Sequence, residues 1–527
     1  MYKILISDKL AQEGIDLINN TEGFEAVIKT KLSEDELASI IGEYDGLIIR
    51  SDTQVTPKVL EKCGKLKGVA RAGVGVDNIN IPEATRKGVL VMNTPGGNTL
   101  SAAEHTMALM LSMSRYVVPA CNSLKAGKWD RKNYMGNQLN NKVLGVIGLG
   151  RIGMAVVRMS LGFNMKVIGY DPFAIPQEAE KLGITITDDL TKIYKEADFI
   201  SVHVPKTKDT ENMIAKEQLA MMKKTTRLIN CARGGIINED ALFDALGAGV
   251  IAGAALDVFT KEPPVNCRFQ ALENCLVTPH LGASTEEAQV EVAVEAAQIL
   301  MDAIKGGPIK NAINAPAMGD SMPKEVIAYS HLAAKIGSLM NCLVAGRVKS
   351  IDLTYLGTIA ALDVAAVTTA FNIAMLQPYF DTPVNIVNIG VLAKERGIST
   401  NVTTNESSNN LSASFTAKVT TDKGSRTVTG TVFDGNILKV VSIDGYNTEF
   451  TPEGTLMVLH YTDRPGVIGA IGTACGKSNI NIGTMSVGRV NNKALMVVSL
   501  DQPLCDATRK ELNKLEYIEE YYTCNIQ

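Results

Sequence analysis

The sequence predicts an α/β protein of several domains whose first part is built on parallel sheets. Over the first 310 residues, short β-branched runs alternate with helical patterns, and a glycine-rich turn follows one of these runs. The texture changes after about residue 307, and 527 residues are too many for one core. We therefore expect two doubly wound domains, followed by an α+β domain and a smaller C-terminal α+β domain.

The composition excludes several kinds of partner. The formal net charge is −4, from 52 basic and 56 acidic residues, so no positive excess favours nucleic acid. The nine cysteines form no C-x-x-C pair, which favours a reducing cytoplasm over a disulfide framework. The N-terminal MYKILISDKL alternates like a strand rather than a signal peptide, and no apolar run reaches the ~18 residues of a membrane span. We expect no membrane association and no bound metal.

The strands of the two doubly wound units can be read in order. In residues 1–97 they are KILISD, DGLIIRS, LKGVARAG and GVLVMNT. A helix follows in SAAEHTMALMLSMSR, where Ser101 and Glu104 have the spacing of a capping box. From Val143 the β-rich runs are VLGVIGLG, KVIGYDP, DFISVHVP, TRLINCA, AGAALDVF and CLVTPH. Such alternation of strands and helices suits a doubly wound nucleotide-binding domain.

The C-terminal part has a different organisation. GPIKNAINAPAMGDSMP is rich in Pro, Gly and Asn, which is typical of a linker. Residues 317–452 begin with a helical pattern and end in strand-like pieces such as SASFTAKVTT. Residues 455–527 read strand, helix, strand, strand, helix, strand, which predicts a small α+β module.

A dinucleotide site is predicted directly after the run VLGVI. Gly148, Gly150 and Gly153 have G-x-G-x-x-G spacing, in which the glycines allow a tight turn, close approach of a pyrophosphate, and packing of helix on strand. The phosphates then face the positive end of the helix. Asp171 ends the next strand, where an acid binds ribose hydroxyls. No arginine or lysine follows in DPFAIP, which favours NAD over NADP. The unit that begins at Val143 is therefore Rossmann-like, and we expect the unit of residues 1–97 to be Rossmann-like as well.

Three polar residues follow later strands at the edge where ligands bind in such a domain. Arg233 follows LINCA, Glu262 lies just past AALDVFT, and His280 closes LVTP. Each alone fits a structural role: a surface arginine, a loop glutamate, a packed histidine. Together they fit oxidation of a 2-hydroxy acid, in which His280 takes the hydroxyl proton, Glu262 favours the imidazolium, and Arg233 grips the carboxylate.

The segments GLGRIG, NCARGGIIN, LDVFTKEP and TPHLGAST resemble the signature segments of the D-isomer-specific 2-hydroxyacid dehydrogenases. The resemblance covers residues 1 to about 310. It implies a substrate-binding domain of residues 1–97 plus 288–312, with an NAD-binding domain, residues 98–287, inserted between them. It also implies these further cofactor contacts: Arg151, Ile152, Cys231, Ala232, Asp257, Leu281, Gly282 and Ala283.

The C-terminal segments also resemble known modules. LHYTDRPGVIGAIGTACGKSNINIGTMSVGR resembles the ACT domain, a module that binds small molecules, and residues 317–452 resemble the intervening domain of the longer family members, which is proposed to bind anions or substrate. The combination implies oxidation of D-3-phosphoglycerate and a homo-oligomer, a dimer or tetramer. It implies that Tyr461, Asp463 and Asn481 bind L-serine across a paired ACT interface. Asn479, on the same strand face, stays an alternative to Asn481.

A phosphorylated substrate requires cations beyond those that hold its carboxylate. The candidate substrate-binding residues are Arg50, Ser51, Arg71, Gly73, Val74, Arg131 and Lys132. By resemblance, the region of Arg131 and Lys132 reaches a neighbouring subunit. Two alternatives stay open: a hydroxypyruvate or glyoxylate reductase with the same triad, and an NAD-sensing corepressor that binds partner peptides.

Overall fold

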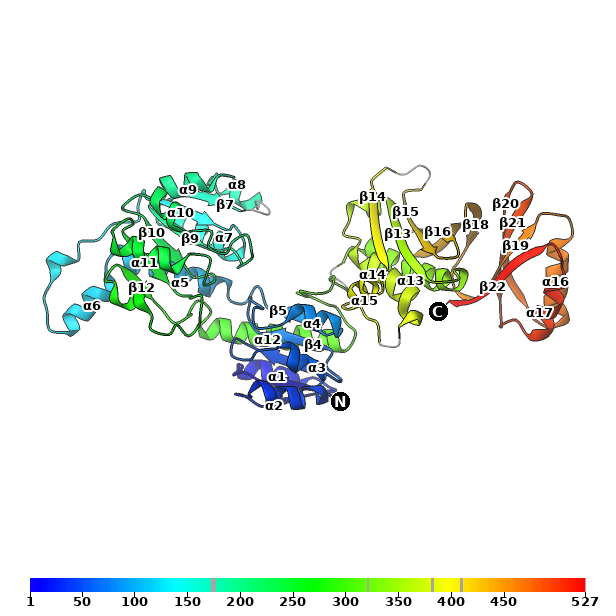
Figure 1. Ribbon diagram of the computed structural model, residues 1–527, viewed down its shortest axis with the longest axis horizontal. Coiled ribbons are helices and arrows are strands. Elements are labelled where there is room, and N and C mark those ends of the chain that lie inside the picture. The colour runs from blue at the N-terminus through cyan, green and yellow to red at the C-terminus, as the bar shows by residue number, and fades with distance from the viewer. Residues whose placement is uncertain (172–176, 320–321, 381–382, 408–410, 527) are drawn as a thin grey trace.

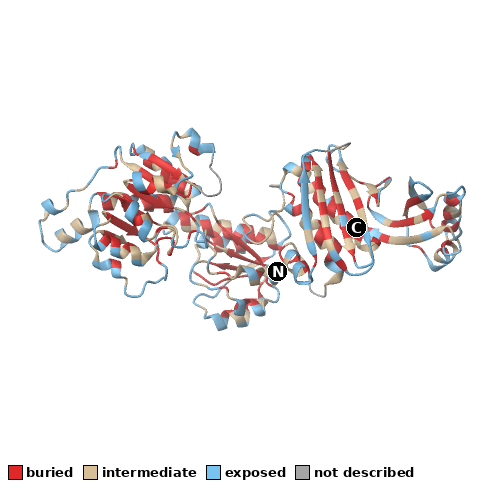
Figure 2. Ribbon diagram, turned by 45° about the horizontal axis from the view of Figure 1, so that its top comes forward, coloured by how far each residue is buried: buried red, intermediate tan, exposed pale blue. Residues whose placement is uncertain are grey.

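The computed structural model describes residues 1–171, 177–319, 322–380, 383–407 and 411–526. Four sheets follow one another along an elongated molecule, with five, seven, six and four strands (Figure 1). The buried residues are concentrated in these sheets and in the helix faces that cover them (Figure 2). The predicted α/β class, with two Rossmann-like domains followed by two α+β domains, is confirmed.

The first sheet is parallel and has the order β2-β1-β3-β4-β5. Its strands are β1 (Tyr2–Ile6), β2 (Phe24–Ile28), β3 (Gly46–Ile49), β4 (Gly68–Arg71) and β5 (Leu90–Asn93). Its helices are α1 (Gln12–Asn20), α2 (Glu34–Ile40), α3 (Pro57–Glu61) and α4 (Ile81–Arg86). The sequence pattern did not predict β2, because this edge strand is buried only at Phe24 and its apolar run is short.

The chain leaves this sheet through α5 (Thr99–Ser114) and returns to it through α12 (Glu286–Ile304). The apolar face of α12, including Ala296 and Leu300, lies in one core with Ile4 and Ile6 of β1. Residues nearly 300 positions apart thus share one hydrophobic core. The predicted capping box at the start of α5 is wrong: the helix begins at Thr99, and the Ser101 hydroxyl instead bonds the Thr285 hydroxyl at 2.7 Å.

The second sheet is parallel, with the order β12-β11-β10-β9-β6-β7-β8. Its strands are β6 (Val143–Ile147), β7 (Lys166–Tyr170), β8 (Thr185–Ile186), β9 (Phe199–Val202), β10 (Arg227–Asn230), β11 (Gly253–Leu256) and β12 (Cys275–Val277). Its helices are α7 (Arg151–Gly162), α8 (Gln177–Lys181), α9 (Leu190–Glu196), α10 (Lys216–Met221) and α11 (Glu239–Gly247). The strand order reverses between β6 and β9, and ligands bind doubly wound sheets at such a switch point.

An exposed arm leaves this sheet between α5 and β6. It contains α6 (Val117–Lys125), none of whose residues is buried, and the short turn Arg131–Asn133. Figure 1 shows α6 standing away from the rest of the chain. Trp129 and Met135 are 80% and 86% exposed, which is unusual for such large apolar side chains.

The third sheet is mixed and the fourth is antiparallel. The third contains β13 (Val348–Gly357), β14 (Ser399–Asn405), β15 (Ala413–Thr421), β16 (Ser425–Phe433), β17 (Ile437–Ile443) and β18 (Tyr446–Phe450), with helices α13 (Lys324–Leu343), α14 (Ala365–Leu376) and α15 (Ile389–Glu395). The fourth follows the predicted order: β19 (Gly454–Thr462), α16 (Val467–Lys477), β20 (Ile482–Val490), β21 (Lys493–Leu500), α17 (Asp506–Leu512) and β22 (Ile518–Ile526). Val458 and Cys524 of the fourth sheet share a core with Ile336 of α13.

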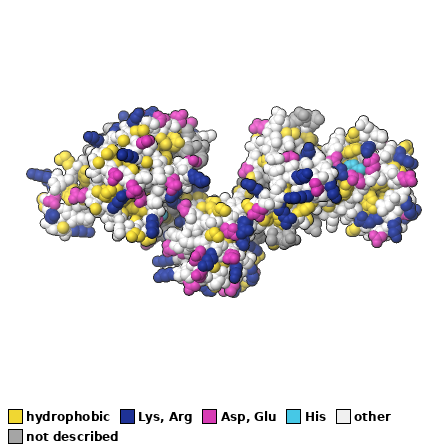
Figure 3. Space-filling view, in the orientation of Figure 1, with side chains coloured by type: hydrophobic (Ala, Val, Ile, Leu, Met, Phe, Trp, Pro, Cys, Tyr) yellow, Lys and Arg dark blue, Asp and Glu magenta, His cyan; other side chains and the backbone are white. Residues whose placement is uncertain are grey.

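The surface agrees with the near-neutral composition. Figure 3 shows acidic and basic side chains interspersed on the face in view. Within the described part of the chain, no helix is long and apolar enough to cross a membrane.

Candidate active site

The glycine turn lies between β6 and α7, at the switch point of the seven-stranded sheet. Gly148 has φ of 100°, and a Cβ at Gly153 would stand 1.9 Å from the Gly148 carbonyl oxygen, so the protein itself requires both glycines. Gly150 is different, because its φ is −68° and nothing lies within 4 Å of a Cβ placed there. Its missing side chain instead leaves room for a group outside the chain at the N-terminus of α7. These residues therefore fit a dinucleotide pyrophosphate.

Asp171 closes the other side of this turn. Its carboxylate accepts a hydrogen bond of 2.8 Å from the Leu149 backbone N–H, which ties the end of β7 to the glycine turn. This places an acid next to the pyrophosphate position, where ribose hydroxyls bind. The segment used to favour NAD over NADP, residues 172–176, lies outside the described residues.

Glu262 and His280 form the central pair of the site. The imidazole Nδ1 of His280 lies 2.7 Å from a carboxylate oxygen of Glu262, whose other oxygen accepts from the Phe259 N–H at 2.9 Å. Burial alone would raise the pKa of Glu262, but the hydrogen bonds from His280 and the Phe259 N–H and the charge of Arg233 lower it overall. The carboxylate is therefore ionised and can stabilise an imidazolium.

The backbone at His280 has an unusual conformation. Its φ is 55°, in the left-handed region that few residues other than glycine adopt. His280 lies in the turn of residues 278–285 between β12 and α12, which we call the corner. The corner is held by Asp257, which is fully buried. Its carboxylate accepts from the N–H groups of Leu281 and Gly282 at 2.8 and 2.9 Å, and its backbone oxygen accepts from the His280 N–H at 2.9 Å.

Arg233 bridges the two parallel sheets. Its Nε donates to Asp77 at 3.0 Å, and its Nη1 donates to the Ala232 carbonyl at 2.7 Å. A Cβ at Gly75 would stand 1.7 Å from the Arg233 guanidinium, so the loop after β4 passes directly over this group. The backbone of this loop and the Arg233 side chain are thus in direct contact.

Arg50 and Arg71 lie close to this loop, at the ends of β3 and β4. The Nε of each is buried without a hydrogen-bond partner among the described residues. Burial, together with the nearby charges of Arg233 and Arg50, lowers the pKa of Arg71 to about 10. Three cations are thus gathered, and Asp77 and Asp8 are the acids whose charges act on Arg71. Such a cluster is suited to an anionic ligand.

The remaining predicted substrate residues divide into two groups. Gly73 donates its N–H to the Thr94 hydroxyl at 2.7 Å, the Val74 carbonyl accepts from Asn93, and exposed Ser51 adjoins Arg50, so these lie on the loops that follow β3 and β4. Arg131 and Lys132 lie in the exposed arm.

The other predicted cofactor residues lie at the ends of nearby elements. Arg151 and Ile152 begin α7, and Cys231 and Ala232 follow β10. Ala283 closes the corner after Gly282, with its carbonyl accepting from Gln289. Burial raises the pKa of the Cys231 thiol to about 12, so this side chain is a neutral thiol.

The predicted serine-binding residues are not gathered in one place within this chain. Tyr461 is 3% exposed and lies in the core of the fourth sheet. Asp463 pairs with Arg489 at 3.3 Å, whereas Asn481 donates to Asp501 at 2.8 Å. β19 and β20 flank β21 in a register that puts Asp463 and Asn481 at opposite ends of the sheet, on the order of 20 Å apart. Both can contribute to one site only if two copies of the sheet meet.

The alternative Asn479 lies at the same end as Asn481. It has φ of 56°, and its carbonyl accepts from Gln502.

Sequence reasoning missed His105, Thr278 and Asp77. His105 and Thr278 both reach the Asp257 carboxylate, and Asp77 pairs with Arg233. Nothing local marks His105, which lies in α5 and is 152 positions from Asp257. Asp77 could have been predicted as a site residue, because it lies in the loop after β4, six residues beyond Arg71.

Comparisons with known proteins agree with this arrangement. Residues 107–282 match the NAD binding domain of D-isomer specific 2-hydroxyacid dehydrogenases, residues 325–444 match the D-3-phosphoglycerate dehydrogenase intervening domain, and residues 455–517 match the ACT domain. The fold and these matches define an NAD-dependent 2-hydroxyacid dehydrogenase with a regulatory ACT domain.

The full-length relatives narrow the class further. The chain is 42% identical to D-3-phosphoglycerate dehydrogenase of Bacillus subtilis over 98% of both chains, and 40% identical to that of a Synechocystis strain over 100% of this chain and 95% of the relative. This chain belongs to the D-3-phosphoglycerate dehydrogenase family.

Solved structures match the first part of the chain. D-lactate dehydrogenase of Aquifex aeolicus, complexed with NAD and lactic acid, is 29% identical with a TM-score of 0.51, covering 58% of this chain and 96% of that one. The TT0316 protein of Thermus thermophilus is 30% identical with a TM-score of 0.55, covering 59% and 99%.

Proposed function

We propose that this chain oxidises D-3-phosphoglycerate to 3-phosphohydroxypyruvate with NAD, the first step of serine biosynthesis, using Arg233, Glu262 and His280. The observation that carries the assignment of roles is the 2.7 Å contact between His280 and Glu262 beside the Arg233 guanidinium. Because Nδ1 of His280 bonds Glu262, Nε2 is left to take the proton of the substrate hydroxyl.

The reaction divides between the cofactor and these residues. NAD would be held at the glycine turn by α7 and Asp171, and it would accept the hydride. Arg233 holds the substrate carboxylate and polarises the forming carbonyl. His280 keeps the hydroxyl proton, and Glu262 stabilises the resulting imidazolium. In the reverse direction His280 returns the proton to the carbonyl oxygen.

The cations at the ends of β3 and β4 support a phosphorylated substrate. Arg50 and Arg71 each keep a buried Nε that nothing in the described chain bonds, and an unpaired buried donor costs about 1–3 kcal/mol. A phosphate offers strong acceptors to both. An unphosphorylated hydroxy acid would leave these donors unsatisfied.

Domain roles follow from the same site. We assign residues 1–97 plus 288–312 to substrate binding, 98–287 to NAD binding, 317–452 to the intervening domain and 455–527 to ACT regulation. The packing of α12 on the five-stranded sheet supports the first assignment. The matched ranges 107–282, 325–444 and 455–517 fall within the other three.

Regulation and assembly form the finer part of the proposal. We infer that the chain works as a homo-oligomer, with the apolar arm at Trp129 and the cations Arg131 and Lys132 directed at a second copy. L-serine binds between two ACT sheets, where Asp463 of one copy can meet Asn481 of the other. The nine free cysteines accord with a reducing cytoplasm.

The direct experiment is NADH oxidation with phosphohydroxypyruvate and with unphosphorylated hydroxypyruvate, each with and without serine. We expect a strong preference for the phosphorylated keto acid, reduced by serine. Equal rates on both substrates would overturn the phosphate assignment. A preference that serine leaves unchanged would overturn only the serine assignment.

A further inference from the structure

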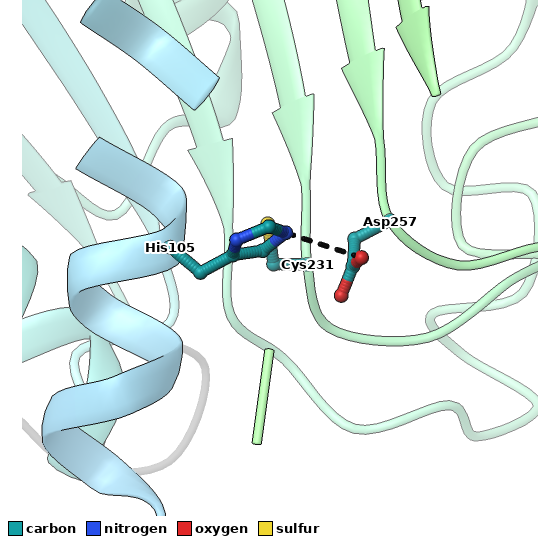
Figure 4. Close-up of side chains that lie close together, drawn as sticks. All are labelled: His105, Cys231 and Asp257. Carbon is teal, nitrogen blue, oxygen red and sulfur yellow. Dashed lines mark hydrogen bonds and ion pairs between the residues drawn. The ribbon is translucent and has the colours of Figure 1, made fainter. Parts of the chain in front are cut away.

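His105 lies next to Asp257, the residue that holds the turn carrying His280. It projects from α5 toward the ends of β10 and β11, where Figure 4 shows its ring directed at Asp257 with Cys231 alongside. Its Nε2 lies 3.2 Å from a carboxylate oxygen of Asp257 and 3.2 Å from the Thr278 hydroxyl. The His105 side chain is 19% exposed, whereas the Asp257 side chain is fully buried.

Asp257 collects most of the hydrogen bonds that shape the corner. One carboxylate oxygen accepts from the Thr278 hydroxyl at 2.6 Å and from the Leu281 N–H, and the other accepts from the Gly282 N–H. These donors lie on both sides of His280, whose φ of 55° requires support from its surroundings. The position of the imidazole therefore depends on the position of the Asp257 carboxylate.

Helix α5 braces the same corner at two further points. The Ser101 hydroxyl bonds the Thr285 hydroxyl at 2.7 Å, and Ala102 lies 3.9 Å from a Cβ placed on Gly282. His105 is one turn further along the helix, on the same face. The helix thus contacts the corner through Ser101, Ala102 and, by way of Asp257, His105.

A metal site is the competing interpretation of these side chains. The possible ligand atoms of His105, Cys231 and Asp257 lie within 4.8 Å of one another. However, both oxygens of Asp257 already accept hydrogen bonds, and burial keeps Cys231 a neutral thiol. The donors around Asp257 describe a hydrogen-bond network better than a cation site.

We propose that His105 is a positioning residue for the dehydrogenase reaction: it holds Asp257, which in turn fixes the corner that presents His280. This inference rests on the proposed role of His280. The imidazole donates through Nε2 to Asp257, completing the set of donors on that carboxylate. Loss of this bond lets the carboxylate shift and with it the N–H groups that shape the corner.

The test compares two variants of the full chain by steady-state kinetics with NADH and phosphohydroxypyruvate. His105→Leu removes the donor, and we expect kcat to fall about tenfold, since small misplacements of a reacting group are costly, with KM for the keto acid nearly unchanged. His105→Gln places an amide N–H at a similar reach and should return kcat to within about threefold of the natural chain. Thermal unfolding, compared with that of the natural chain, verifies that both variants fold.

A double variant separates positioning from general damage. If His105 acts through His280, adding His105→Leu to His280→Ala should cause no further loss of kcat. The inference would be overturned if the kcat losses of the two single variants multiplied in the double variant. It would also be overturned if His105→Gln did not recover kcat, or if His105→Leu left kcat unchanged. If His280→Ala itself kept most of the turnover, the proposed function of His280 would fail instead, which a separate measurement of that variant reveals.

Discussion

The two parallel sheets differ in how far the chain itself satisfies the charged side chains at their ends. The five-stranded sheet ends in Arg50 and Arg71, each with a buried donor that has no partner in the described chain. The seven-stranded sheet ends in Asp257 and Glu262, whose carboxylates accept hydrogen bonds from the chain itself. These two arginines therefore keep unsatisfied buried donors, whereas the chain itself satisfies these two carboxylates.

This difference indicates how the work is divided. Unsatisfied buried donors cost stability and are compensated only when an anion binds, so the first sheet is suited to recognising a ligand. Saturated carboxylates hold their neighbours in fixed positions, so the second sheet is suited to orienting reacting groups. Substitutions on the two sheets should consequently have different signatures.

The largest effect is expected at the pair Glu262–His280. His280→Ala should lower kcat by at least about 10²-fold, because the substrate proton loses its acceptor. Stopped-flow and steady-state assays with NADH would measure this, and NADH affinity should stay within about threefold. A loss of less than tenfold would show that another group transfers the proton.

On the opposite sheet, Arg71→Met should separate affinity from stability. Burial lowers the pKa of Arg71 to about 10, so the cation destabilises the folded chain at neutral pH, and this cost is relieved only as the pH rises above 10. We expect the KM for phosphohydroxypyruvate to rise about 30-fold or more, while the ligand-free chain becomes about 1 kcal/mol more stable. Thermal unfolding and kinetics measure the two effects. If Arg71→Met lowered both the affinity for phosphohydroxypyruvate and the stability of the ligand-free chain, a ligand-recognition role would be contradicted.

Asp257→Asn should show the reverse signature. Burial would raise the pKa of Asp257, but hydrogen bonds from His105, Thr278 and Leu281 lower it overall. Because its folded pKa is lowered, its contribution to stability is present above the ordinary carboxyl range and is lost as pH falls through the folded value. We expect a loss of about 1–3 kcal/mol at pH 7 that shrinks below about pH 4. Urea unfolding at both pH values measures it.

The exposed carboxylate Glu178 serves as the matched control for Asp257. It pairs with Arg158 on the surface of the same domain, and its side chain is 49% exposed. Glu178→Gln should leave unfolding unchanged at either pH. An equal loss in both variants would mean that burial of the carboxylate does not decide its contribution.

The smallest effect is expected at Asp77, the partner of Arg233 across the two sheets. The Asp77 side chain is 68% exposed, so this ion pair is screened by water and contributes less than about 1 kcal/mol. Asp77→Asn should change stability by no more than that and KM by no more than about threefold. Calorimetry and kinetics at low and high salt would detect it. A tenfold change in KM would mean that Asp77 also orients Arg233 toward the substrate.

Much of the fold and of the site follows from local sequence signals. The strand carrying VLGVIGLG, the acid that ends the next strand and the triad after later strands are recognisable because parallel strands end at one edge of their sheet. The order of elements in the last module is equally legible from its alternating pattern. The edge strand β2 and the true start of α5 escaped, because a half-exposed strand has a weak pattern and Ser101 bonds Thr285 instead of capping its own helix.

By itself, the sequence determined the doubly wound class and the dinucleotide turn, and it predicted the roles of Arg233, Glu262 and His280, since these depend on residue type and spacing. Only the tertiary structure decided that His105 meets Asp257, that the Nε donors of Arg50 and Arg71 have no partner among the described residues, and that Asp463 and Asn481 lie at opposite ends of one sheet. The physical reason is range: periodicity records local burial, whereas a hydrogen bond between residues 152 positions apart depends on how a helix packs on a sheet.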